Sequence, residues 1–166
     1  MSTEAVADTS FLIDWARYSK RDLLFQLFQL VWIPEPVIAE VRSTTTLEWL
    51  SQSLAKGRMA LLPEFAEFRE AALRLVSISR RYPVRGLDYP EAYCLSVAEA
   101  RGLIVLSENG GAYSAQFLYS SAKVWRAFDV LAELARRGLL TKDDVLKYQE
   151  ETGHRFSKRD LQTLGP

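Results

Sequence analysis

Short apolar runs alternate along the chain with longer segments whose apolar residues recur every three or four positions. Short runs bounded by charged residues, glycine or proline are typical of buried strands. Apolar residues spaced at helical intervals are typical of helices that bury one face. This pattern predicts strands at residues 4–7, 30–33, 58–64 and 103–106.

The segments between these runs carry helix start and stop signals. Asp8 precedes FLIDWARY as a helix-starting residue, and Pro34 and Pro36 stand near the start of a short helix. Gly57 and Gly102 each follow a helical pattern at the position where glycine ends helices. The helices predicted from these signals are residues 11–18, 21–29, 34–43, 44–57, 64–82 and 90–102.

Strands separated by helices indicate a parallel sheet covered on both faces. After residue 120 the pattern changes to helices, at 125–138, 141–153 and 157–164. In the last of these, Ser157 and Asp160 have the spacing of a helix capping box. We therefore expect an α/β domain over residues 1–128 and a helical C-terminal extension over residues 129–166, packed on the same domain.

The composition supports one hydrophobic core. A chain of 166 residues with 48% hydrophobic residues is long enough for one core of ordinary size and short for two. Lys and Arg total 21, and Asp and Glu also total 21, so no overall charge attracts the chain to nucleic acid or to an anionic membrane. A nucleic-acid surface must therefore be a local patch.

Scarce residue types narrow the chemistry further. Cys94 is the only cysteine and His154 the only histidine, which excludes an intrachain disulfide and a His-rich metal site. Metal chemistry must then use oxygen ligands. The sequence shows no signal peptide and no apolar stretch near the roughly 18 residues that span a bilayer, which predicts a cytoplasmic protein with no membrane contact. Asn109 is the only asparagine, a composition that favours a thermophilic source.

Four polar residues follow the predicted strands. Asp8 ends the first strand, and Asn109 comes just after strand 103–106. Glu40 lies one short helix after strand 30–33, and Glu91 lies in the first turn of helix 90–102. Because the carboxyl ends of parallel strands share one edge of the sheet, we expect these side chains to converge there. Mg²⁺ and Mn²⁺ prefer oxygen ligands, so the cluster predicts a site for one of these ions.

The order and spacing of these motifs resemble the PIN-domain ribonucleases, including the VapC-type toxins. The matching segments are VADTSFLID, PEPVIAEV and PEAYCLSVAEARGLIVLSENG. The segments WRAFDVLAELARRGLL and GHRFSKRDLQTL are similar to the helical C-terminal extension of one PIN subgroup. The resemblance implies a three-layer α/β/α fold with a central parallel sheet of four to five strands.

The resemblance also implies a function. In that family four acids from these places bind one or two divalent ions and hydrolyse single-stranded RNA. Carried over to this chain, three of the acids are Asp8, Glu40 and Glu91, and the fourth position, usually aspartate, is Asn109. Glu108 beside it, or Asp88 before Glu91, would supply a further carboxylate. The family further implies a homodimer and, in toxin systems, an antitoxin protein as partner.

Several residues near these acids are candidates for contact with RNA. Arg80, Arg81 and Arg85 lie in the segment leading to Glu91 and would form a phosphate-binding patch. Ser10 and Ser107 follow the same strand ends as Asp8 and Asn109. A solvated loop is an equally simple interpretation of the three arginines.

The candidate metal ligands also have purely structural interpretations. Asp8 is a favourable N-cap residue, and Glu91 suits the positive end of its helix. Asn109-Gly110 is a turn dipeptide, because both residues tolerate left-handed backbone angles. An amide oxygen supplies no charge, so Asn109 should weaken a carboxylate site. The rival hypothesis is therefore a degenerate PIN domain that binds RNA or a protein partner without cutting.

Overall fold

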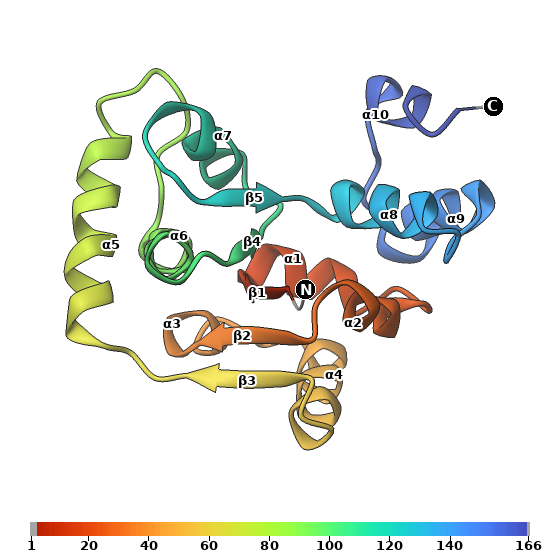
Figure 1. Ribbon diagram of the computed structural model, residues 1–166, viewed down its shortest axis with the longest axis horizontal. Coiled ribbons are helices and arrows are strands. Elements are labelled where there is room, and N and C mark those ends of the chain that lie inside the picture. The colour runs from red at the N-terminus through yellow and green to blue at the C-terminus, as the bar shows by residue number, and fades with distance from the viewer. Residues whose placement is uncertain (1–2, 166) are drawn as a thin grey trace.

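The computed structural model describes residues 3–165 and is organised around a five-stranded sheet in which every neighbouring pair of strands is parallel (Figure 1). The strand order is β3-β2-β1-β4-β5, so β1 is central and is flanked by the strands that come second and fourth along the chain. The strands are β1 (Glu4–Ala7), β2 (Leu30–Pro34), β3 (Met59–Leu62), β4 (Ile104–Leu106) and β5 (Lys123–Trp125). The four strands predicted from the sequence are confirmed.

Helices cover both faces of the sheet. Helices α5, α6 and α7 lie on one side and α1, α2, α4, α8 and α9 on the other, which confirms the three-layer α/β/α architecture (Figure 1). The helices are α1 (Thr9–Trp15), α2 (Leu24–Leu27, after a 3₁₀ turn at Arg21–Leu23), α3 (Glu35–Ile38), α4 (Thr44–Ala55), α5 (Ala66–Ser79), α6 (Tyr89–Arg101), α7 (Gly110–Leu118), α8 (Ala127–Arg136), α9 (Lys142–Thr152) and α10 (Lys158–Gln162).

Three segments differ from the sequence prediction. Helix α3 ends at Ile38, so Glu40 lies in the turn that follows rather than on a helix. The Asn109-Gly110 pair does not form a left-handed turn: Asn109 has φ −75° and caps α7, which begins at Gly110. Strand β5 lies in the region for which only helices were predicted. It is a short edge strand that pairs with β4.

The C-terminal helices share the core of the sheet. One cluster of buried residues includes strand residues together with Leu131 on α8 and Tyr148 on α9. Trp15 on α1 stacks on Phe11 with ring centroids 5.2 Å apart and contacts Tyr148 at 5.5 Å. The expected boundary at residue 128 falls within the first turn of α8, and the division into a domain and an extension stays a prediction.

Gly111 packs directly on the loop before α6. A Cβ at this position would lie 2.9 Å from the Gly86 carbonyl oxygen and 3.0 Å from that of Arg85. Both atoms belong to the backbone, so Gly111→Ala is expected to displace the loop and lower the free energy of unfolding by about 1–3 kcal/mol. Gly110→Ala is the matched control, because nothing lies within 4 Å of a Cβ there. Denaturant titration compares the two, and equal midpoints would contradict the expected clash.

Candidate functional site

The candidate site lies where the carboxyl ends of β1 and β4 meet. Ala7 pairs with Leu106, and the Asp8 N–H donates to the Leu106 carbonyl at 2.9 Å. The chain leaves β1 towards β2 and later returns on the other side of β1 to form β4. Such a reversal of strand order opens the crevice in which parallel α/β sheets bind ligands.

The Asp8 carboxylate is surrounded by hydrogen-bond donors. Its Oδ1 accepts the Thr9 N–H at 2.8 Å, which is the N-cap bond of α1. Its Oδ2 accepts from Ser107 Oγ at 2.9 Å, Asn109 Nδ2 at 3.0 Å and Ser10 Oγ at 3.2 Å. The residue is only 2% exposed, and burial raises its pKa, although the bonds from Ser107, Thr9 and Ser10 lower it. The structure thus brings Asp8 and Asn109 into direct contact.

Glu91 faces the same region from α6. The Asp88 carboxylate accepts the Glu91 N–H at 3.0 Å, and Glu91 Oε2 accepts the Asp88 N–H at 3.4 Å, so the two acids form a capping box. Glu91 is 1% exposed, and its Oε1 has no hydrogen-bond partner among residues 3–165. Burial, followed by repulsion from Asp88 and Asp8, raises the pKa of Glu91 to about 8, although Arg85 opposes the shift.

Glu40 is exposed and lies close enough to Asp88 and Asp8 for their charges to affect its pKa. Its Oε1 accepts a hydrogen bond from Thr9 Oγ1 at 3.2 Å. Burial, Asp88 and Asp8 all raise the pKa of Glu40. Thr9 is not among the candidate residues that the sequence indicates, although it lies in the segment VADTSFLID.

Glu108 points away from Asp8. Its Oε1 accepts the Ala127 N–H at the start of α8, and its Oε2 lies 3.4 Å from His154 Nε2. Burial raises the pKa of Glu108. The assignment of Glu108 as a metal ligand stays a prediction, and in the structure its carboxylate contacts Ala127 and His154. The side chain of His154 is 35% exposed and lies between two acids, Asp14 and Glu108.

The other candidates divide into buried and exposed groups. Ser107 is fully buried, and Ser10 and Ser107 direct their hydroxyls to Asp8, so both serve the acid cluster. Arg80, Arg81 and Arg85 are exposed, and none of them forms an ion pair within the described part of the chain. The three arginines lie between α5 and the start of α6.

The donor chemistry of the edge fits a hard divalent cation. Burial and the nearby charge of Asp88 both raise the pKa of Asp8, Glu40 and Glu91, and the unpartnered Oε1 of Glu91 is the kind of buried oxygen that a cation would satisfy. Across residues 3–165, no three acid, histidine or cysteine side chains lie close enough together to hold a metal ion as they stand.

Glu91 is expected to make the stability of the metal-free protein depend on pH. Its pKa is raised from 4.5 to about 8, so the folded state holds the proton more tightly than the unfolded state. The resulting stabilisation is complete below the unfolded pKa and is lost as the pH rises through about 8. Glu91→Gln should reduce this fall, which denaturant titrations in EDTA between about pH 5 and pH 8 would measure. An unchanged slope would contradict the assignment.

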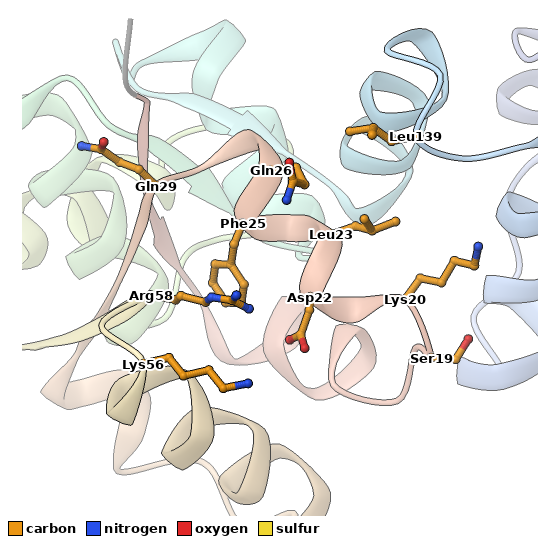
Figure 2. A pocket seen from close by; sticks show the side chains of 10 residues that line it. All are labelled: Ser19, Lys20, Asp22, Leu23, Phe25, Gln26, Gln29, Lys56, Arg58 and Leu139. Carbon is orange, nitrogen blue, oxygen red and sulfur yellow. The ribbon is translucent and has the colours of Figure 1, made fainter.

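A cavity of about 770 Å³ lies away from the acid edge (Figure 2). Figure 2 shows Lys56 and Arg58, which precede β3, beside Phe25 of α2, and Leu139 on the far wall. Apart from Leu139, which follows α8, the residues that line this cavity precede strands β2 and β3, whereas Asp8 follows β1. The cavity is therefore separate from the candidate site. In residues 3–165 no helix is both long and apolar enough to cross a bilayer.

Solved structures share this fold at low sequence identity. PAE2754 from Pyrobaculum aerophilum has a TM-score of 0.55 and 15% identity over 81% of this chain and 90% of that one. VapBC-5 from Mycobacterium tuberculosis, a member of the VapBC family of toxin-antitoxin systems, has a TM-score of 0.52 and 18% identity over 75% and 99%. FitAB bound to an IR36 DNA fragment has a TM-score of 0.51 and 15% identity over 74% and 94%.

No curated protein matches the chain. Its sequence does match the family DUF3368, described as a PIN domain, over residues 4–163, which is nearly the whole chain. The match includes all five strands and the four acids at the candidate site, which are Asp8, Glu40, Asp88 and Glu91. The chain belongs to the PIN-domain family.

Proposed function

We propose that the protein is a metal-dependent endoribonuclease that hydrolyses single-stranded RNA. The observation that carries the proposal is the Oε1 atom of Glu91, which is buried without a hydrogen-bond partner. Burial and the charges of Asp88 and Asp8 raise the pKa of the same carboxyl group. Asp8 and Glu91 would hold Mg²⁺ or Mn²⁺, assisted by Glu40 and by the amide oxygen of Asn109. When bound, the ion would supply the positive charge that activates a water and offsets charge on the scissile phosphate.

The residues of the chain would bind and orient the substrate. Arg80, Arg81 and Arg85 carry the positive charge that attracts RNA phosphates. Ser10, Ser107 and the N-cap bond of α1 hold the Asp8 carboxylate in one orientation, so little reorganisation is needed when charge develops. The expected products carry a 5′-phosphate and a 3′-hydroxyl.

The comparisons support a proposal about partners as well. Two of the similar structures are VapBC-5, a member of a family of toxin-antitoxin systems, and FitAB, which is bound to DNA. By analogy, the chain would be the toxin of such a pair, held inactive by an antitoxin, and would act as a homodimer in the cytoplasm. Sedimentation of the purified protein over a range of concentrations tests the dimer, and a monomer at all concentrations would contradict it.

The contacts of Asp8 favour a second candidate function. Oδ2 of Asp8 already accepts three hydrogen bonds, one of them from Asn109, so this carboxylate is satisfied without a cation. A PIN domain arranged in this way would bind RNA or a protein partner through the exposed arginines and would not cut. Both candidates use the same surface, and only the first requires a metal.

One experiment separates the two candidates. The purified protein is titrated with Mn²⁺ in a calorimeter and incubated with 5′-labelled single-stranded RNA, with Mn²⁺ or with EDTA. The nuclease should bind the ion and cut only in its presence. RNA binding without cleavage and without Mn²⁺ binding would overturn the nuclease assignment and support the binding module.

A further inference from the structure

Glu108 joins three segments of the chain at the corner beside Asp8. Its backbone N–H donates to Ser10 Oγ on α1 at 3.1 Å. One carboxylate oxygen accepts the Ala127 N–H at the start of α8, and the other lies 3.4 Å from His154 Nε2. The side chain is only 10% exposed. A carboxylate enclosed in this way, with both oxygens engaged, is held in one orientation.

His154 extends this connection to the loop between α9 and α10. Its Nδ1 lies 3.4 Å from Oδ2 of Asp14 on α1, while its Nε2 faces Glu108 after β4. The imidazole also packs on Phe156, with ring centroids 5.6 Å apart. Because the two ring nitrogens face acids from two different elements, His154 links α1 to the loop that follows β4.

The groups that orient Asp8 lie on either side of Glu108. Ser107 and Asn109 both donate to Asp8 Oδ2, and the Asn109 N–H donates to Ser107 Oγ at 3.2 Å. Fixing Glu108 therefore fixes the two side chains that face Asp8. We propose that Glu108 and His154 are positioning residues, through which the C-terminal segment sets the orientation of Ser107 and Asn109 towards Asp8.

The positioning role needs neither metal nor RNA, and only its effect on metal affinity rests on the proposed function. Hydrogen exchange in EDTA tests it first, for the segment that contains the Glu108 and Asn109 amides. Glu108→Ala should speed exchange there by at least about tenfold, measured well below the thermal midpoint. Glu108→Gln should stay close to wild type, because its amide oxygen still accepts the Ala127 N–H. Glu150→Ala, an exposed change on α9, is the control.

His154→Ala provides a second variant on a partly exposed residue in case Glu108→Ala fails to fold, and it should speed exchange in the same segment. If Glu108→Ala folds and its segment exchanges at the wild-type rate, the proposal is overturned. If Glu108→Ala does not fold, exchange at the wild-type rate in His154→Ala overturns it instead. Mn²⁺ titration of the same proteins should show a loss of affinity of roughly tenfold in Glu108→Ala that Glu108→Gln restores. If the wild type binds no Mn²⁺, the nuclease proposal fails, and the exchange data still decide the positioning role.

Discussion

Replacing Asp8 by asparagine is expected to abolish Mn²⁺-dependent RNA cleavage and leave the fold intact. Asparagine is as good an N-cap residue as aspartate, so the bond from the Thr9 N–H survives through the amide oxygen. The substitution removes the charge of a buried acid at the centre of the cluster. Loss of an outer partner of a metal site costs about 10–100-fold in affinity, and loss of a direct ligand should cost more. Calorimetric Mn²⁺ titration and RNA cleavage measure the two losses.

Asp143→Asn is the matched control for this experiment. Asp143 is an exposed acid on α9, so the same chemical change there should alter neither metal binding nor cleavage. Circular dichroism and the thermal midpoint verify that both variants are folded. Full cleavage by Asp8→Asn would mean that the acid edge is not the catalytic centre.

The sequence predicted the sheet because the central strands are buried on both faces. Residues 5–7 of β1 are completely buried, and such continuous apolar runs are recognisable without any tertiary information. Strand β5 was missed for the opposite reason. It is a three-residue edge strand that begins with the exposed Lys123, and its identity as a strand depends on pairing with β4.

Helix α7 and the direction of Glu108 depend on contacts that are distant in sequence. The Asn109-Gly110-Gly111 run has the composition of a turn, yet Gly111 is required where α7 packs on the backbone of Arg85 and Gly86. Glu108 turns away from Asp8 because the Ala127 N–H and His154 bind its carboxylate. Ala127 and His154 are both distant from Glu108 in sequence, so a local sequence pattern does not reveal them. The sequence could therefore place Glu108 near the site but could not predict the orientation of its side chain.

The proximity of Asp8 and Asn109 could be predicted, since it follows from the geometry of parallel strands. Asp8 directly follows β1, Asn109 comes three residues after the end of the neighbouring β4, and the structure places Asn109 Nδ2 3.0 Å from Asp8 Oδ2. Which of the two residues donates the hydrogen bond could not be predicted. Asn109 donates a hydrogen bond to Asp8, and in this orientation the amide stabilises the carboxylate in the absence of a cation.

Asn109→Asp is therefore expected to have opposite effects on stability with and without metal. Without metal, the change removes a hydrogen bond to a charged group, which costs about 1.5–3 kcal/mol, and places a second carboxylate beside the buried Asp8. The thermal midpoint in EDTA should fall. With Mn²⁺ the added carboxylate becomes a charged ligand, so the affinity should rise by at least about tenfold. The midpoint should then recover as the Mn²⁺ concentration increases.

The two functional candidates give different outcomes for this variant. If the wild type is a nuclease weakened by its amide, Asn109→Asp should increase both Mn²⁺ affinity and the rate of RNA cleavage. If the domain only binds RNA, the repulsion between Asp8 and the new acid persists at every Mn²⁺ concentration, and the midpoint never recovers. Gln149→Glu would be a poor control, because Gln149 is buried. Gln52→Glu on the exposed face of α4 is a suitable one, since it adds the same charge far from the acid edge.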